Sequence, residues 1–333
     1  MRSALLRGFT SQKRPARRRT TAGRTQEGPR VTTIGFIGLG VMGAPMAANL
    51  VDAGFDVIGY NRSPGKSRVL AEKGGRTTGS VAEAVAGADV VITMLPDSPD
   101  VEAVVLGDGG VLDNARPGTL LIDASTIRPQ ISRAVAAAAA ERGVRALDAP
   151  VSGGEAGAIE GTLSIMVGGD AGDFTAAAEV FDAVGSTIVH VGPAGAGQTV
   201  KAANQLIVAG HLELLAEALV FLDAHGVDLS SAITVLGGGL AGSNVLARKA
   251  PGMLARHFEP GFRVDLHHKD LGIVVDSARA AGVAIPLGAH VADLLTSLRA
   301  QGAGSLDHST LLLQVEQLSG KHTGLSTAER APR

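Results

Sequence analysis

A glycine-rich turn, Gly38-Leu39-Gly40-Val41-Met42-Gly43, is the feature that most constrains how this chain can fold. It lies between an apolar, strand-like segment at 34–37 and a helix-like segment at 44–51. In such a turn the first glycine permits the bend, the second lets a pyrophosphate approach the backbone, and the third lets the helix pack close to the strand. The helix N-terminus offers free N–H groups to the phosphates. The motif therefore predicts a dinucleotide-binding unit, with all six residues as cofactor contacts.

The end of the next strand-like segment, 56–60, bears on the choice of nicotinamide cofactor. An acidic residue at this position binds the ribose 2′-hydroxyl of NAD, whereas an arginine accommodates the 2′-phosphate of NADP. The chain has Asn61-Arg62-Ser63 there, without a carboxylate. These three residues are candidate cofactor contacts and favour NADP(H). NAD(H) stays possible, because Arg62 could instead stack on the adenine of an NAD enzyme.

Two further segments, at 89–95 and 119–123, are almost continuously apolar, and helix-like segments at 80–85 and 128–142 alternate with them. Such strands are typical of a parallel sheet covered on both faces. The predicted class is therefore α/β, with a Rossmann-type doubly wound parallel sheet in the N-terminal part. Ligands bind at the carboxyl ends of such strands, which makes Leu95, Pro96 and Thr126 candidate cofactor contacts. Alternatively, Pro96 simply ends its strand.

A Ser152-Gly153-Gly154 segment follows the next apolar stretch. Successive backbone N–H groups in such a turn can form a small anion-binding nest. These three residues are candidate contacts for a substrate carboxylate. A glycine-rich hairpin without a ligand is the alternative interpretation.

Lys201 is the only formally charged side chain between Asp182 and Glu213. Lysine is rarely buried without a partner, so a lone ammonium on an apolar helix indicates a chemical role. Asn204 and Gln205 lie three and four residues further on and share the helical face of the lysine. The alternative is a lysine that extends its ammonium group to the surface.

A helix over 198–224 would span about 40 Å, enough to cross from one domain into another. Helical patterns follow at 229–236, 241–255, 268–281, 288–301 and 309–319. We expect a dinucleotide-binding domain at 31–193, an all-helical domain at 194–320 and a tail at 321–333. The helical domain would supply the interface of a homodimer or homotetramer.

The composition narrows the possible functions. A net charge of −2 argues against non-specific nucleic-acid binding, and the absence of cysteine excludes disulfides and thiolate chemistry. The histidines lack His-Glu-x-x-His spacing, so no metal site is expected. The apolar stretch at 206–222 is interrupted by His211, Glu213 and Glu217, which predicts no membrane span and a cytoplasmic protein.

The first 30 residues contain Arg14, Arg17, Arg18 and Arg19 with a single acid, Glu27. They are interpreted as a disordered basic leader. Such a segment is either a mitochondrial transit peptide or an untranslated stretch before a true start at Val31. The second interpretation is favoured.

Four ordered motifs carry a family resemblance that covers about 33–318. They are the glycine-rich turn, Asp148-Ala-Pro-Val-Ser-Gly-Gly154, Gly197-Gln-Thr-Val-Lys201-Ala-Ala-Asn204 and Lys269-Asp270-Leu271. Together they resemble the β-hydroxyacid dehydrogenase family. The resemblance implies that Lys201 is catalytic, that Ser152, Gly153, Gly154 and Asn204 contact substrate, and that Thr126 and Lys269 lie near the nicotinamide.

Phe262 would close the apolar side of the pocket, or else serve as a plain core residue. Asp270 is expected to fix Lys269 or a helix end. An ammonium at Lys201 can stabilise charge on a carbonyl oxygen and protonate it, so it suits reduction.

Within the family, the stretches at 237–246, 260–271 and 307–309 of the C-terminal half most resemble the branch that reduces tartronate semialdehyde (2-hydroxy-3-oxopropionate) to glycerate. The expected partner is thus a small carboxylate semialdehyde. Sibling enzymes act on 3-hydroxyisobutyrate, glyoxylate or succinic semialdehyde, and their binding pockets differ by only a few side chains. A non-catalytic nucleotide-binding module is the more distant alternative.

Overall fold

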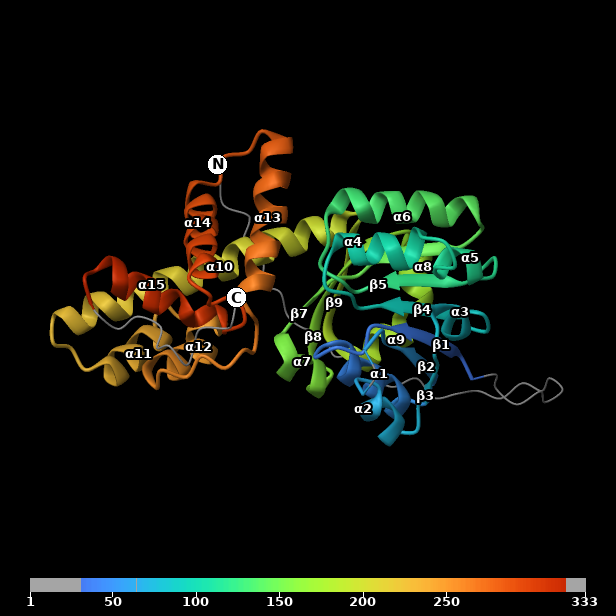
Figure 1. The fold of residues 1–333 in the computed structure, drawn as a ribbon, viewed down its shortest axis with the longest axis horizontal. Helices are drawn as coiled ribbons and strands as arrows, with labels where there is room; N and C mark the ends of the chain where they lie inside the picture. Colours follow the sequence, from blue (N-terminus) through green and yellow to red (C-terminus); the bar gives the residue numbers. More distant parts are fainter. Residues whose placement is uncertain (1–30, 64, 322–333) are drawn as a thin grey trace, which may run out of the picture. The chain divides into compact units, whose positions relative to one another are not determined.

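The computed structural model describes residues 31–63 and 65–321, so the leader expected at 1–30 and the tail from 322 onwards lie outside the described residues. The N-terminal part is a mostly parallel sheet with helices on both faces, and the part from residue 196 to 321 is built of helices (Figure 1). This arrangement confirms the expected α/β class, with a Rossmann-like domain, a long helix and a helical C-terminal region.

The sheet is assembled from strands β1 Thr33–Ile37, β2 Asp56–Tyr60, β3 Arg76–Thr77, β4 Val90–Thr93, β5 Leu120–Asp123, β6 Arg145–Asp148, β7 Val151–Ser152, β8 Leu163–Gly169 and β9 Gly185–Gly192. Their spatial order is β3-β2-β1-β4-β5-β6-β8-β7, and β9 pairs with β8. All pairs from β3 to β6 are parallel, whereas β8 runs antiparallel to β6 and β7. The sequence did not indicate this antiparallel extension of the sheet. The Ser-Gly-Gly segment begins at the last residue of β7, within this extension.

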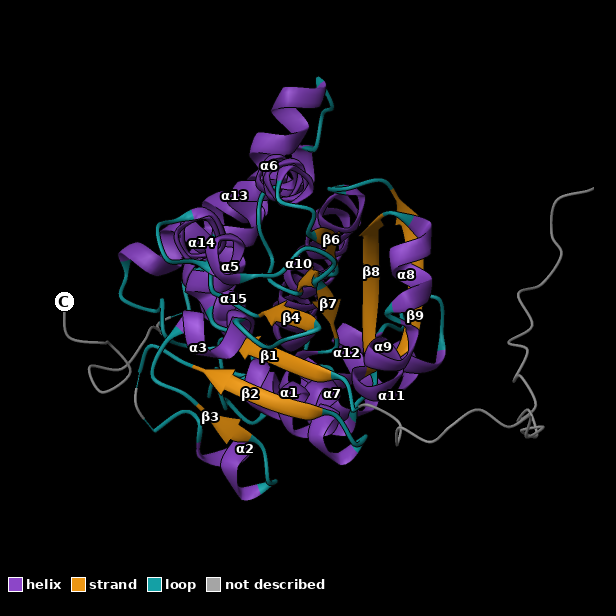
Figure 2. Ribbon diagram, turned by 90° about the vertical axis from the view of Figure 1, so that its right-hand side faces the viewer, coloured by secondary structure: helices purple, strands orange, loops and turns teal. Residues whose placement is uncertain are grey.

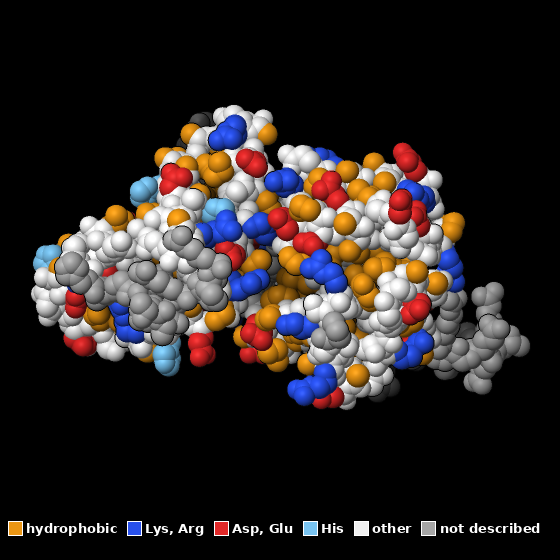
Figure 3. All heavy atoms as spheres, viewed as in Figure 1, with side chains coloured by type: hydrophobic (Ala, Val, Ile, Leu, Met, Phe, Trp, Pro, Cys, Tyr) orange, Lys and Arg blue, Asp and Glu red, His pale blue; other side chains and the backbone are white. Residues whose placement is uncertain are grey.

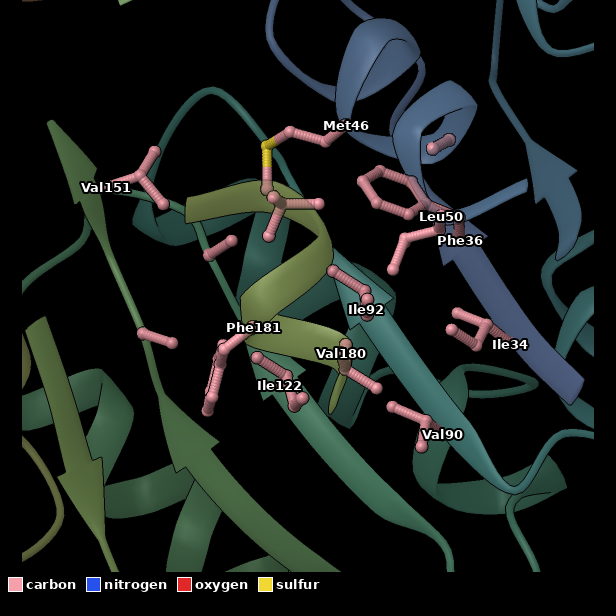
Figure 4. Packing of buried hydrophobic residues seen from close by; sticks show 14 of the residues in the cluster. Ile34, Phe36, Met46, Leu50, Val90, Ile92, Ile122, Val151, Val180 and Phe181 are labelled. Atoms are coloured by element: carbon pink, nitrogen blue, oxygen red, sulfur yellow. The ribbon is translucent and has the colours of Figure 1, made fainter. Parts of the chain in front are cut away.

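The strands bury both faces, because successive side chains point to opposite sides. Phe36 and Ile92 belong to a core with α1 (Gly43–Asp52), α7 (Gly154–Glu160) and α9 (Ala178–Val184), part of which is shown in Figure 4. Ile37 and Val91 belong to a second core with the helices between residues 81 and 141. Helices therefore flank the sheet on both sides (Figure 2). Their bounds are α1 Gly43–Asp52, α2 Arg68–Glu72, α3 Val81–Val85, α4 Ser98–Val101, η1 Glu102–Leu106, α5 Val111–Asn114, α6 Pro129–Glu141, α7 Gly154–Glu160, α8 Ala171–Ala176 and α9 Ala178–Val184.

The C-terminal region has its own apolar core around one long helix, α10. It comprises α10 Ala196–Ala224, α11 Leu229–Gly238, α12 Asn244–Leu254, α13 Val264–Ala281, α14 Pro286–Ala300, η2 His308–Thr310 and α15 Leu311–Leu318. By length and composition α10 could cross a membrane, but half of its most apolar window is buried inside the protein. Because it packs against α12, α13, α14 and α15, it has the character of a core helix.

The first turn of α10 is fixed to the sheet by two side chains. The Asp148 carboxylate at the end of β6 accepts hydrogen bonds from the backbone N–H of Gly195 at 2.7 Å and of Gln198 at 2.9 Å. The Gln198 amide in turn donates to Ser125 O at 2.8 Å and accepts from Ile127 N at 3.1 Å. The N–H groups that a helix start leaves unpaired are thus satisfied from the strand ends, which sets the position of α10 relative to the sheet.

Further along α10, Glu213 is buried at 2% exposure, and its Oε2 has no hydrogen-bond partner among the described residues. Burial, with a smaller effect of Glu217, raises the pKa of Glu213 from 4.5 to about 7. Because the folded pKa lies above the unfolded value, this group destabilises the protein progressively as the pH rises from about 4.5 through about 7.

The isosteric change Glu213→Gln is therefore expected to increase the free energy of unfolding by about 2–3 kcal/mol at pH 8 and to leave it nearly unchanged at pH 4.5. Urea unfolding at the two pH values measures this difference. Glu141→Gln, at an exposed position, is the control and should show no pH-dependent gain. An equal effect of Glu213→Gln at both pH values would contradict the assigned cause.

Candidate active site

The glycine-rich turn has the geometry that a dinucleotide needs. Gly38 adopts a φ of +101°, and its N–H donates to Tyr60 O at 2.9 Å. A Cβ at Gly43 would collide with the carbonyl oxygen of Gly38, so this position admits only glycine. A Cβ at Gly40 would instead meet nothing within 4 Å. Protein packing does not require glycine at position 40, whereas the close approach of a pyrophosphate does, so the residues present fit the cofactor.

The other residues of the turn take different positions. Leu39 is fully buried in the core, and its N–H donates to Asn61 Oδ1 at 3.0 Å. Val41 is exposed, and Met42 packs against the core. Asn61 also donates from Nδ2 to Ser63 O at 3.0 Å. Asn61 therefore braces the turn against the loop after β2, a role that the sequence did not indicate.

Arg62 and Ser63 are exposed beside this brace. One guanidinium nitrogen of Arg62 lies 3.9 Å from Asp100 Oδ1, and the arginine side chain is 87% exposed. Such a loose, solvated ion pair contributes little and leaves the guanidinium available to an anion.

The ends of β4 and β5 meet as expected for neighbouring parallel strands. The N–H of Leu95 donates to Ser125 Oγ at 2.9 Å, while Pro96 is exposed. The carbonyl of Thr126 accepts a hydrogen bond at 2.6 Å from Nζ of Lys269 on α13. This contact brings Lys269 from the helical region to the strand ends, next to Thr126. Figure 3 shows blue Lys and Arg side chains where the helical region meets the sheet.

Lys201 is 7% exposed, and its Nζ donates to Val151 O at 2.8 Å. Burial lowers the pKa of Lys201 from 10.5 to about 8, while the Asp270 carboxylate opposes this shift and the Lys269 ammonium adds to it. The lysine is thus not extended to the surface. Its ammonium lies beside the residue that precedes Ser152, so the structure brings the lysine and the Ser-Gly-Gly segment together.

The Ser-Gly-Gly segment is a turn between β7 and α7, not a hairpin. Gly153 and Gly154 have φ values of +146° and +66°, which only glycine adopts without strain. Ser152 and Gly153 are half-buried and Gly154 is exposed. Arg248 of α12 donates to Gly153 O at 3.0 Å, a contact that the sequence did not indicate. The turn therefore lies within reach of two cations, Lys201 and Arg248.

Behind the lysine, a chain of polar side chains joins α10 to α13. Asn204 Nδ2 donates to Gln205 Oε1 at 2.8 Å, and Gln205 Nε2 donates to Asp270 Oδ2 at 2.5 Å. Asp270 Oδ1 lies 2.8 Å from Lys269 Nζ. Asp270 thus holds Lys269, as expected, but its link to Gln205 was missed. The adjacent Lys269-Asp270 pair and the helical spacing of Asn204 and Gln205 were signals that side chains meet here, though not with which partner.

Phe262 is half-buried, and its ring packs edge-on against His267 and His308, at centroid distances of 5.6 and 5.4 Å. The two histidines share a hydrogen bond between their Nδ1 atoms at 2.8 Å. Burial lowers the pKa of His267 to about 4, although Asp270 opposes it, and burial also lowers the pKa of His308. Both imidazoles are therefore neutral at neutral pH and act as a rigid support for Phe262. In residues 31–63 and 65–321 no group of three or more His, Asp or Glu side chains could hold a metal ion.

Comparisons with known proteins identify the family of the chain. Residues 33–192 match the family model described as the NAD-binding domain of 6-phosphogluconate dehydrogenase, and residues 195–315 match the one described as the NAD-binding of NADP-dependent 3-hydroxyisobutyrate dehydrogenase. The 2-hydroxy-3-oxopropionate reductase of Escherichia coli (strain K12) is 40% identical over 286 residues, covering 86% of this chain and 98% of that protein. The chain belongs to the β-hydroxyacid dehydrogenase family.

Other relatives of this dehydrogenase differ in their named substrates. The NAD-dependent L-serine dehydrogenase of Pseudomonas aeruginosa is 40% identical over 285 residues, covering 84% of this chain and 96% of that protein. The structure of Mycobacterium tuberculosis 3-hydroxyisobutyrate dehydrogenase with L-serine superposes with a TM-score of 0.78, at 40% identity over 86% of this chain and 99% of that one. This dehydrogenase is thus an oxidoreductase that acts on a hydroxyl group with a nicotinamide cofactor.

Proposed function

We propose that this dehydrogenase reduces tartronate semialdehyde (2-hydroxy-3-oxopropionate) to glycerate in the cytoplasm, with Lys201 as the general acid. The observation that carries the proposal is the buried ammonium of Lys201, held 2.8 Å from Val151 O next to the Ser-Gly-Gly turn. The name of the 40% identical Escherichia coli relative supports this substrate.

In this mechanism the Ser152-Gly153-Gly154 turn binds the substrate carboxylate through its backbone N–H groups, with Arg248 close by. A reduced nicotinamide, when bound, supplies the hydride to the aldehyde carbon. The negative charge that develops on the aldehyde oxygen is stabilised by the Lys201 ammonium, which then donates a proton to it. Asn204 contacts the substrate from the same helical face, and Phe262 closes the apolar side of the pocket.

The test is the rate of absorbance loss at 340 nm with tartronate semialdehyde, glyoxylate, succinic semialdehyde and methylmalonate semialdehyde, each with NADPH and with NADH. The highest kcat/KM for tartronate semialdehyde is expected. A preference for another semialdehyde would move the chain to a sibling activity, and the relatives named for 3-hydroxyisobutyrate and L-serine make these the alternatives to examine. No turnover of any substrate would overturn the proposal and favour a nucleotide-binding module.

The cofactor residues of the proposal are the glycine-rich turn, the loop Asn61-Arg62-Ser63, the strand ends at Leu95, Pro96 and Thr126, and Lys269. Arg62 favours NADP(H), because its exposed guanidinium has no strong partner in the described part of the chain. Arg62→Gln is expected to raise the KM for NADPH about 10-fold and to leave that for NADH almost unchanged. Arg68→Gln, another exposed arginine, is the control. Equal losses for the two cofactors would count against a contact with the 2′-phosphate.

A homodimer or homotetramer is proposed from the exposed face of α10. Val200, Ile207, Leu214 and Phe221 recur every seven residues along this helix and are 38%, 56%, 52% and 62% exposed. Such a continuous apolar stripe is typical of a helix that packs against another protein surface. A second copy of the chain is the proposed partner.

The double change Leu214→Lys and Phe221→Lys is expected to lower the molar mass measured by light scattering to that of a monomer. Val235→Lys, at a 75% exposed position on α11, is the control and should leave the mass unchanged. A monomeric wild-type protein would refute the interface.

A further inference from the structure

The hydrogen-bonded side chains Asp270, Gln205 and Asn204 have a fixed donor and acceptor arrangement, because each side chain determines which atom of the next one must face it. The series begins at Asp270, which is 3% exposed and lies 2.8 Å from the Lys269 ammonium. A carboxylate accepts hydrogen bonds and cannot donate them. The side-chain amide of Gln205 must therefore turn its NH2 group towards Asp270 Oδ2, at 2.5 Å.

This orientation of Gln205 determines that of Asn204. With Nε2 facing Asp270, the Gln205 side chain can present only its Oε1 to Asn204. An oxygen without a proton accepts a hydrogen bond, so Asn204 must offer its own NH2 group, at 2.8 Å. Gln205 is 4% exposed, and its amide makes hydrogen bonds to both Asp270 and Asn204, so that rotating the amide would break two buried hydrogen bonds.

The fixed orientation of Gln205 leaves the side-chain oxygen of Asn204, the last residue of this hydrogen-bonded series, free to accept a hydrogen bond. Asn204 is half-buried, and its Oδ1 makes no hydrogen bond to any other described residue. It lies three residues after Lys201 on the same helical face. The face that carries the reactive ammonium therefore also offers an oriented hydrogen-bond acceptor.

We propose that the Asp270–Gln205–Asn204 relay selects substrates that carry a hydrogen-bond donor on carbon 2, such as the hydroxyl group of tartronate semialdehyde and glycerate. The hydroxyl donates to Asn204 Oδ1. A substrate with a methyl group or a hydrogen atom at that carbon leaves Asn204 Oδ1 without a hydrogen bond in the complex, which disfavours that substrate. The inference rests on the proposed function and deepens it, because it states which side chains set the preference within the family.

The test compares glycerate with 3-hydroxyisobutyrate, which replaces the carbon-2 hydroxyl by a methyl group of similar size. In the oxidative direction the wild-type kcat/KM is expected to favour glycerate about 10- to 100-fold. Gln205→Met keeps the length of the side chain but frees Asn204 to rotate, and it should reduce this ratio at least about 10-fold. Glu217→Gln, an exposed position on the same helix, should leave the ratio unchanged.

Asn204→Leu provides a second variant at a half-buried position if Gln205→Met fails to fold. It removes the acceptor and should lower activity with glycerate while sparing 3-hydroxyisobutyrate. A wild-type ratio near one, or a ratio that survives both variants, would overturn the relay while leaving the dehydrogenase activity intact.

Dissociation constants for the two acids, measured by calorimetry with the oxidised cofactor bound, separate the relay from the proposed reaction. If neither acid is turned over, the proposed function fails, and the ratio of the two constants still decides the relay. Tighter binding of glycerate that is lost in Gln205→Met supports the inference, and equal binding overturns it.

Discussion

Replacing Lys201 with methionine is expected to lower kcat for aldehyde reduction by about 10²- to 10⁴-fold while leaving the dissociation constant of the cofactor nearly unchanged. Methionine has a similar length and no charge, so it can occupy the 7% exposed site without a burial penalty. The loss should therefore report the missing ammonium. Steady-state kinetics and cofactor titration of the same samples measure both quantities. Retention of more than about a tenth of wild-type kcat would refute the general-acid role.

The pH dependence gives the same lysine a second signature. Its pKa of about 8 means that the ammonium form decreases as the pH rises through this value. Reduction, which needs the protonated lysine, should slow above about pH 8, and oxidation, which needs the neutral amine, should accelerate over the same range. Lys66→Met, at an exposed position, should preserve both profiles, whereas Lys201→Met should flatten them.

The second large effect is expected from Asp307→Ala, which should reduce the free energy of unfolding by about 3–5 kcal/mol. Asp307 is 3% exposed and accepts both hydrogen bonds from Lys249, at 2.8 and 2.9 Å. It also accepts from the backbone N–H groups of Gly261, Phe262 and Ser309, each at 3.0 Å. Alanine would leave a partly buried ammonium and three backbone donors without this partner.

Chemical denaturation at pH 7 measures this loss. Asp276→Ala removes a carboxylate that is 57% exposed and should change stability by less than about 0.5 kcal/mol. Burial would raise the pKa of Asp307, but the charge that His308 acquires at low pH, the Lys249 ammonium and the hydrogen bonds outweigh it and lower the pKa from 3.8 to about 2. The contribution of this carboxylate is therefore complete above about pH 4 and decreases as the pH falls through about 2. A loss as small as that of Asp276→Ala would contradict the stabilising role assigned to the contacts of Asp307 with Lys249 and the three backbone N–H groups.

The sequence predicted those features whose causes are local. The glycine-rich turn, the apolar strand that precedes it and the helix that follows are determined by neighbouring residues, and β2 was predicted at its observed bounds, Asp56–Tyr60. The long helix was predicted from residue 198 and begins at Ala196. Lys201 could be singled out because a charged residue in an otherwise apolar helix is evident from the sequence alone.

Other features depend on partners far away in the chain. Gln205 meets Asp270 across 65 residues, and Asp148 meets Gly195 across 47. No spacing rule predicts such pairs. The strands β7 and β8 were not predicted, because β7 has only two residues and the pairing of β8 depends on distant strands. The apolar pattern of a buried strand also does not reveal its direction. The helix predicted at 241–255 begins only at Asn244, because Ser243 caps it by accepting a hydrogen bond from Leu246 N at 3.0 Å.

Because the first turn of α10 is attached to the strand ends, the position of Lys201 depends on its distance in residues from that attachment. Gln198 anchors the helix to the strand end, and Lys201 lies three residues further on. Each residue between them adds a rise of about 1.5 Å and a rotation of about 100° about the helix axis. A single inserted or deleted residue in this interval would turn the ammonium away from Val151 O, whereas a conservative side-chain replacement there would not. Natural variants of this enzyme should therefore differ in length within surface loops and keep the number of residues between these two positions constant.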